Sequence, residues 1–418
     1  MTATPVTDTM TVKDRRSVTA LPALDTMRAI AAIAVLATHA SFWGGAYARP
    51  HYGTALSRLD IGVAVFFVLS GFLLTRPWFT RHDHGYPAPS TRTYLWRRVL
   101  RVMPVYLIAA VAALVLLPGN NDASPATWLK TLTLTNIYFD GRLPDGLTQM
   151  WSLGTEAAFY LVLPLLLWLA LSRRRDHGHG PSRLSVVLAA MVLVNVAWLA
   201  MVSSGLELDG TMMSLWLPSY LTWFAVGMLI AACAVRTSDA PDTRGAAATS
   251  WLAEAVRRMG QAPGACWTAG LALFAIASTP IAGPALLIPP TLGEALGKNL
   301  LYAAIAGLLI LPGVYADPRG RYARAMSWRP FRHLGHLSYG IFCVHLVILE
   351  LVWRWRDMEL FHGRTLELFT ITLAMSVVVS EILYRLVELP SMRWKSLFDR
   401  PPSSVSATIT PRPANTSS

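Results

Sequence analysis

The sequence is poor in cysteine and in charge. Its 418 residues include three cysteines, and charged residues make up 14% of the chain. The cysteines lie in or beside apolar segments and have neither a disulfide framework nor the spacing of metal ligands, so we expect no metal. Soluble domains carry about 25% charged residues. The low charge, together with 54% hydrophobic residues, excludes that class and predicts an integral membrane protein with several spans.

Basic residues exceed acidic ones, and the formal net charge is +12. These basic residues lie in short clusters between apolar runs, as the loop charges of a membrane protein do. The charge therefore indicates a lipid bilayer as the partner, and no nucleic acid.

Long apolar runs predict an all-α, polytopic helical bundle with about ten transmembrane helices. The predicted spans cover residues 24–42, 60–75, 103–117, 150–171, 184–204, 212–235, 266–284, 297–316, 334–353 and 366–388. The seventh span is interrupted by Pro280 and Pro284. The third is short, and we expect it to extend back through residues 97–101 as an interfacial helix. Residues 118–150 are expected to form a long external loop.

Lys and Arg gather on one side of this predicted bundle. With the N-terminus in the cytoplasm, 26 of the 36 basic residues fall in cytoplasmic segments and 8 in external loops. This bias predicts that both termini are cytoplasmic, in a multi-pass protein of the plasma (inner) membrane. Residues 1–20 lack the apolar core of a signal peptide. We expect a disordered tail there, a membrane domain at 21–395 and a second disordered tail at 396–418.

The first predicted span carries Asp25, Arg28 and His39. Ionisable side chains in hydrocarbon are costly, and those that persist usually face a protein or water-filled interior. At about 100° per residue these three fall on one helical face, with His39 about 16 Å along the axis from Arg28. Asp25 and Arg28 are predicted to pair. The alternative is an Arg at the membrane surface and a His bonded to a neighbouring helix.

The chain enters the fourth predicted span from outside, and Glu156 lies about one and a half turns into it, at a depth comparable with that of His39. A carboxylate can fix an imidazole tautomer while the other ring nitrogen takes a proton from a hydroxyl. Matched depth on two helices therefore predicts a general-base dyad of His39 and Glu156. The alternative is that Glu156 pairs with an Arg or meets water at the outer interface.

Three arginines, Arg97, Arg98 and Arg101, lie at the inner boundary ahead of the third span. Guanidinium groups offer bidentate geometry to phosphate, so the cluster suits a polyanion such as a nucleotide diphosphate. The positive-inside rule and anionic lipid would produce the same cluster.

The last two spans add further polar residues. His345 is predicted near the midplane of the ninth span, with Ser338 and Tyr339 one to two turns closer to the cytoplasm. In the tenth span Arg385 and Glu388, three residues apart, are expected to pair.

The second span contains Ser70 and Gly71 within a run of large apolar residues. Small residues let helix backbones approach each other, so this pair is predicted to permit close helix packing.

Taken together, these motifs resemble the membrane acyltransferase family 3, a family of integral O-acyltransferases, from Leu24 to about Trp394. The motifs occur in the family's order: Leu-Asp-x-x-Arg with Arg-x10-His (Arg28, His39), Phe-Phe-Val-Leu-Ser-Gly-Phe (Phe66 to Phe72), Arg-x-x-Arg with a following proline (Arg98, Arg101, Pro104), Trp-Ser-Leu-x-x-Glu-x-x-Phe-Tyr (Trp151 to Tyr160), Leu-Ser-Tyr-x5-His (Leu337 to His345) and Glu-x-Pro (Glu388, Pro390).

The resemblance implies transfer of an acyl group, acetyl or another short acyl, from acyl-CoA to a hydroxyl, usually on a carbohydrate. By this similarity His39 is the essential histidine and Arg28 its motif partner, with Glu156 as a candidate for orienting the base. Arg98 and Arg101, with the adjacent Arg97, are the donor-binding residues. Possible support residues are Asp25, Ser70, Trp151, Ser152, Ser338, Tyr339, His345 and Glu388.

Several alternatives stay open at this stage. Acceptors of similar proteins include surface or exported glycans, lipid-linked sugars and the sugars of secondary metabolites such as macrolides. The acceptor hydroxyl attacks the donor directly with His39 as base, or an acyl-enzyme forms on a Ser or on His. The competing function is a proton-coupled transporter or flippase, because intramembrane ionisable groups also mark proton relays. A sensor or scaffold without turnover is a third possibility.

Overall fold

A computed structural model describes residues 21–172, 182–206, 208–238, 251–285 and 288–398. Within these ranges the regular structure is helical. The long helices are α2 (Pro22–Trp43), α4 (Ile61–Asp83), α5 (Thr91–Leu116), α8 (Trp151–Leu171), α9 (Arg183–Ser203), α10 (Leu221–Ser238), α13 (Leu292–Tyr315), α15 (Arg329–Trp355) and α16 (Thr365–Leu383). The predicted disordered tail at 1–20 lies outside the described residues, as does most of the one at 396–418.

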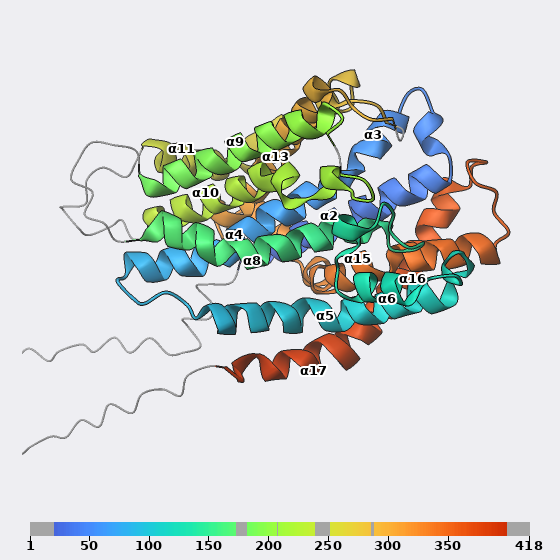
Figure 1. Ribbon diagram of the computed structural model, residues 1–418. Helices are drawn as coiled ribbons and strands as arrows, with labels where there is room; N and C mark the ends of the chain where they lie inside the picture. Colours follow the sequence, from blue (N-terminus) through green and yellow to red (C-terminus); the bar gives the residue numbers. More distant parts are fainter. Residues whose placement is uncertain (1–20, 173–181, 207, 239–250, 286–287, 399–418) are drawn as a thin grey trace, which may run out of the picture.

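The chain forms a bundle whose successive long helices run in alternate directions (Figure 1). Nine helices of the described chain are long and apolar enough to cross a membrane. The seventh predicted span is instead the shorter apolar helix α12 (Pro263–Ala277), with the prolines beyond its end. At 1.5 Å per residue its 15 residues span about 22 Å, less than the hydrocarbon of a bilayer. The predicted polytopic helical membrane fold is confirmed, with α12 as a short tenth pass.

Both ends of the described chain lie at one end of the bundle, where α2 begins and α4 ends (Figure 1). Thr93, near the start of α5, donates a 3.0 Å hydrogen bond to the carbonyl of Phe398. We call this end the inner end, because the sequence predicts that it is cytoplasmic. An even number of passes is required to return the chain to it.

Helix α5 is one continuous helix that contains the arginine cluster. Its N-cap is Ser90, whose hydroxyl accepts from the amide of Thr93. The third predicted span does extend back through the arginines, as the sequence indicated, and it presents Arg98 and Arg101 inside the bundle.

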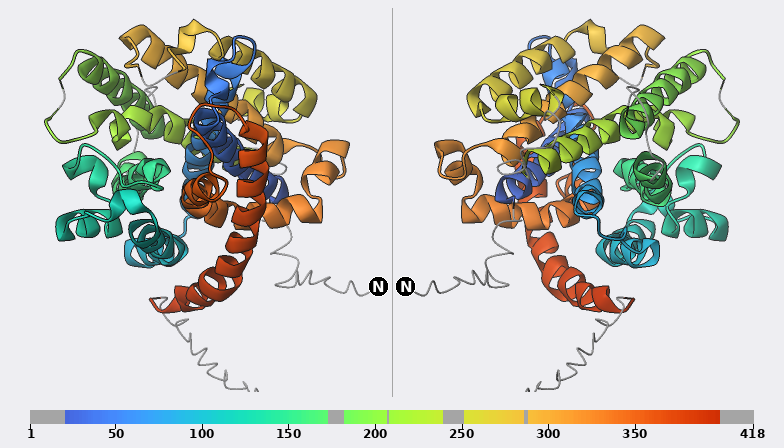
Figure 2. Two further views of the ribbon diagram at one scale, coloured as in Figure 1. Left: turned by 90° about the vertical axis from the view of Figure 1, so that its right-hand side faces the viewer. Right: turned by 90° about the vertical axis from the view of Figure 1, so that its left-hand side faces the viewer.

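Helix α2 lies near the middle of the bundle (Figure 2) and contacts α4, α13, α15 and α16. Gly335 permits the close approach of α15, since a Cβ there would overlap the backbone carbonyl of Asp25. In α4, a Cβ at Gly71 would overlap the carbonyl of Phe224 in α10. The predicted close packing of the second span is therefore confirmed at Gly71.

The connection from α5 to α8 enters the bundle rather than staying outside it. Asn120 ties its two ends together, with Nδ2 donating to the carbonyls of Ala113 (2.9 Å) and Asp145 (3.1 Å). Further along, Gln149 donates to the carbonyls of Phe342 and Cys343 at 3.4 and 3.3 Å. Helix α8 consequently begins level with the middle of α15.

The C-terminal segment continues α16 through a π-helical turn, η8 (Tyr384–Glu388), into the short helices α17 (Leu389–Ser391) and η9 (Met392–Ser396). This segment bends away from the main body and runs alongside α5 (Figures 1 and 2). The indole of Trp96 donates a 3.0 Å hydrogen bond to the carbonyl of Trp394. The turn places Glu388 against α5.

Candidate active site

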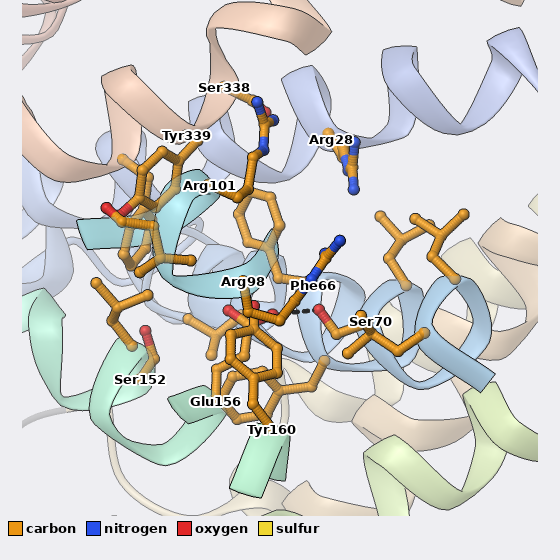
Figure 3. A pocket seen from close by; sticks show the side chains of 18 residues that line it. Arg28, Phe66, Ser70, Arg98, Arg101, Ser152, Glu156, Tyr160, Ser338 and Tyr339 are labelled. Atoms are coloured by element: carbon orange, nitrogen blue, oxygen red, sulfur yellow. Dashed lines mark hydrogen bonds between the residues drawn. The ribbon is translucent and has the colours of Figure 1, made fainter. Parts of the chain in front are cut away.

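A cavity of about 100 Å³ lies between five helices, α2, α4, α5, α8 and α15 (Figure 3). Arg28, Arg98 and Ser338 line it, and they stand six, seven and nine residues into their helices. At 1.5 Å per residue these three lie about 9 to 14 Å from the inner starts of their helices, and the lining residue Phe342 lies about 20 Å from the start of α15. At about 30 Å³ per water molecule, its volume corresponds to roughly three waters. That room accommodates a small acyl group.

Three guanidinium groups point toward this cavity from α2 and α5 (Figure 3). Arg101 forms an ion pair with Glu388, whose side chain is 4% exposed. Arg28 is 3.9 Å from Asp25, which confirms the predicted local pair. Arg98 has no ion pair among the described residues, and its Nε is buried without a hydrogen-bond partner. Arg98 is thus the cation best placed to meet an anionic ligand.

The expected pairing of Arg385 with Glu388 is wrong. Arg385 pairs with Glu381 at 2.5 Å, four residues earlier, and Glu388 pairs with Arg101. The π-helical turn at 384–388 gives the physical reason, because it changes the angular spacing that a regular helix would give to residues three apart.

Ser70 and Glu156 meet inside the cavity. The Ser70 hydroxyl, on α4, donates to Oε1 of Glu156, on α8 (Figure 3). Tyr160 follows Glu156 by one turn of α8 and lines the same cavity. No ion pair holds Glu156 in the described part of the chain. The cavity therefore holds a hydroxyl, a carboxylate and a phenol close together. Arg98, which has no ion pair among the described residues, lines the same cavity.

A second polar group, His39 and His345, lies nearer the outer end. Their ring centroids are 5.3 Å apart. Nδ1 of His345 contacts the carbonyls of Phe342 (2.9 Å) and Ile341 (3.1 Å). A carbonyl can only accept, so Nδ1 carries a hydrogen, and the neutral ring presents an electron pair at Nε2. That Nε2 is buried without a hydrogen-bond partner.

The predicted contact between His39 and Glu156 does not form: the described residues pair Glu156 with Ser70 and place His39 against His345. The inward path of the preceding loop explains this. Gln149 is level with Phe342, and Glu156 lies seven residues further along α8 toward the inner end. This spacing puts Glu156 about 10 Å deeper than Phe342, and deeper still than His345, which lies three residues further toward the outer end of α15.

The ring of Phe342 connects the cavity to the histidine pair. Phe66 and Phe342 line the cavity and pack together with centroids 5.8 Å apart. On its other side, Phe342 lies 5.9 Å from the ring of His345. In the sequence, Phe66 and Tyr160 appear only as members of motifs and were given no role, and Phe342 was not singled out, because apolar and aromatic residues fill every span.

The remaining candidates fall around these two groups. Ser152 and Ser338 line the cavity, but each hydroxyl donates to a backbone carbonyl, of Gln149 (3.0 Å) and Gly335 (2.7 Å). Tyr339 also lines it and donates to the carbonyl of Val102 at 2.7 Å.

Besides His39, His345 and Glu388, three further candidates are not among the residues that line the cavity. Arg97 donates to the carbonyl of Lys395 at 3.4 Å. Trp151 packs on the ring of Tyr220 with centroids 5.0 Å apart. Asp25 lies between Arg28 and Arg332, 3.9 Å from each.

Comparison with known proteins identifies the family. A family model described as an acyltransferase domain matches residues 21–385. The chain is 25% identical to the peptidoglycan O-acetyltransferase OatA of Listeria monocytogenes over 405 residues, which cover 88% of this chain and 55% of that protein. It is 28% identical to the acyltransferase MdmB of Streptomyces mycarofaciens over 410 residues, 89% of this chain and 92% of that protein.

No solved structure matches the chain. The chain spans about half the length of the Listeria relative and nearly all of the Streptomyces one. Because the family model covers nearly all of the described bundle, the chain belongs to the acyltransferase family that its sequence motifs resemble, and it is a multi-pass membrane protein of that family.

Proposed function

We propose that this protein moves a short acyl group from acyl-CoA to a hydroxyl of a carbohydrate or glycosylated acceptor, in the plasma membrane. The cavity carries this proposal. It collects guanidinium groups near the inner end, beside a carboxylate and a hydroxyl, in a chain of the acyltransferase family. Guanidinium groups bind phosphate, and coenzyme A is a polyanion whose thioester lies at the end of a long arm.

The donor enters from the cytoplasm in this proposal. Arg98 and Arg28 face its phosphates or the developing charge of the thioester oxygen. Arg101 is held by its ion pair with Glu388, so its guanidinium keeps a fixed position and offers only part of its positive charge to the donor. The small volume of the cavity favours acetyl or propionyl over a long acyl chain.

His39 is the general base for the acceptor. It takes the proton of the acceptor hydroxyl, the oxygen attacks the acyl carbonyl, and the ester bond forms as the bond to the leaving group breaks. His345 takes the orienting role that the family resemblance assigned to Glu156. Its Nε2 has no hydrogen-bond partner among the described residues and is available to accept an N–H of His39 across the 5.3 Å ring contact; such a bond fixes the tautomer that leaves the other nitrogen of His39 free as a base.

The names of the relatives support a hydroxyl acceptor of the carbohydrate class. The Listeria protein is named for O-acetylation of peptidoglycan, which is a glycan polymer, and the Streptomyces protein is named as an acyltransferase. A surface glycan and a glycosylated metabolite both present sugar hydroxyls to a base at the outer end of the bundle.

The test is thiol release by the purified protein in detergent with acetyl- or propionyl-CoA and a panel of glycosides and peptidoglycan fragments. We expect acceptor-dependent release that falls at least about 100-fold in His39→Ala, the usual scale for losing a general base. Arg98→Ala should raise the Kd for CoA. Arg97→Ala is the matched control, because it removes the same charge from the next position, outside the cavity.

Two outcomes would contradict the proposal. If CoA does not bind, the donor assignment fails and the transporter alternative takes its place. If CoA binds through Arg98 but turnover is absent with every acceptor, the protein is a binding module and the enzymatic proposal fails.

A further inference from the structure

His39 lies outside the cavity, against His345, and Phe342 lines the cavity and contacts His345. A thioester that enters the cavity from the inner end therefore meets a different set of reactive groups before it meets His39. The first group to accept the acyl group is therefore expected among the side chains that line the cavity.

The cavity is lined by three serines, and they differ in their hydrogen bonds. The hydroxyls of Ser152 and Ser338 are held by backbone carbonyls. Ser70 donates to the carboxylate of Glu156. A hydroxyl bonded to a positioned carboxylate is the arrangement of a nucleophile with its base. Ser70 is the one serine among the described lining residues that has it.

The surroundings of Ser70 and Glu156 complete this arrangement. Glu156 has no ion pair in the described chain, so its carboxylate is free to take a proton. Glu388, rather than Glu156, neutralises Arg101. Arg98 retains a buried Nε–H without a partner in the same cavity. An unpaired donor of this kind is suited to the oxyanion that forms when a thioester carbonyl is attacked.

We propose that Ser70 is acylated, with Glu156 as its base, as a covalent intermediate of the proposed acyl transfer; the inference rests on that function. The Ser70 oxygen attacks the thioester carbonyl and its proton passes to Glu156. The carbon–sulfur bond breaks, and coenzyme A leaves as the thiolate and takes a proton from water. The enzyme retains the acyl group as an ester on Ser70.

The second half-reaction returns each group to its starting state. The acceptor hydroxyl gives its proton to His39 and attacks the ester carbonyl of acyl-Ser70. The bond to the Ser70 oxygen breaks, and Glu156 returns the proton to it. His39 then releases its proton to water. Phe342 lies between the two groups, so this step requires its ring to move aside and acyl-Ser70 to approach His39.

The test is the intact mass of the purified protein after incubation with acetyl-CoA and no acceptor. We expect the mass of one acetyl group per chain, placed on Ser70 by fragmentation of its peptide, with release of one thiol per chain. Ser70→Ala should abolish the adduct, and Glu156→Gln should slow its formation at least about 100-fold. Ser70→Cys should give an adduct that hydroxylamine removes rapidly, as expected of a thioester.

Thr75→Val is the matched control. Thr75 lies on the same helix, and its hydroxyl donates to the carbonyl of Gly71 at 2.6 Å, so the adduct should persist. CoA binding and the unfolding midpoint of Ser70→Ala show whether that variant is folded.

The inference fails if wild-type protein turns over without an adduct, if the adduct lies on Tyr160 or His39, or if folded Ser70→Ala keeps its acceptor-dependent rate. In each case the proposed acyl transfer survives. Absence of thiol release from wild-type protein with every acceptor, by contrast, would contradict the proposed function itself.

Discussion

Replacing Arg101 by alanine should destabilise the protein as well as perturb its donor site. Its partner Glu388 is 4% exposed, and Arg101 is 28% exposed. Removing one member of a buried ion pair costs about 3–5 kcal/mol, because the other charge stays buried alone. Water still reaches part of Arg101, so we expect the low end of that range, about 3 kcal/mol in the free energy of unfolding.

The companion variants form a thermodynamic cycle. Glu388→Ala alone should also destabilise, because it leaves Arg101 without its partner. The double variant leaves neither charge uncompensated, so it should be more stable than the sum of the two single effects predicts. Contacting charged residues show coupling of about 0.5–3 kcal/mol in such cycles. If the Arg101 guanidinium also contacts the donor, the double variant should regain stability without regaining CoA binding.

The assay is unfolding in mixed detergent micelles, followed with a thiol-reactive dye. Cys233, Cys266 and Cys343 are free and buried, so each becomes reactive when the bundle opens. Arg98→Ala is the comparison, because Arg98 has a buried Nε without a partner and no ion pair in the described chain. It should leave the unfolding midpoint unchanged or raise it, and should weaken CoA binding about tenfold or more.

The reasoning is refuted if Arg101→Ala leaves unfolding unchanged and weakens CoA binding as much as Arg98→Ala does. Arg101 would then face the donor as freely as Arg98, and its pairing with Glu388 would contribute nothing to stability.

Three further predictions follow from the packing. His345→Ala should lower kcat at least about tenfold with the Kd for CoA unchanged, because His39 loses its neighbour; an unchanged kcat would remove His345 from the site. Gly335→Ala should lower the free energy of unfolding by about 1–3 kcal/mol, because the added Cβ would overlap the carbonyl of Asp25. If the variant unfolds at the wild-type midpoint in the dye assay, that packing is contradicted. Phe342→Ala should extend the cavity toward the histidines and raise the rate with butyryl-CoA relative to acetyl-CoA; an unaltered chain-length preference would show that Phe342 does not limit the donor.

Much of the fold was predictable, because a membrane span can be recognised in a sequence by its length and hydropathy. The sequence also predicted Arg98 and Arg101 at the inner boundary and Ser338 and Tyr339 on the inner side of the midplane, and in the structure these four residues line one cavity. Such predictions need only the rise per residue along each helix, which is a local property of the backbone.

The partners of the charged groups were not predictable in the same way. Asp25 and Arg28 lie on one regular helix and do pair. Glu388 was expected to pair with Arg385, but a π-helical turn and the return of the C-terminal segment along α5 bring it to Arg101. Nothing in the local sequence specifies that long-range contact.

The error over Glu156 has a similar origin, and it bears on the mechanism. Depth was counted from the start of the fourth span, on the assumption that residues 118–150 stay outside. The loop descends into the bundle and is anchored by Gln149 on the backbone of α15, so α8 begins level with the middle of α15 and the depth count began too far out. Once that offset is applied, the single dyad becomes two groups, Glu156 with Ser70 and His39 with His345. In a two-step reaction each step needs its own base next to its own hydroxyl. The two proton-accepting groups, Glu156 and His39, lie on opposite sides of Phe342, and they therefore fit a two-step reaction better than a single-step one.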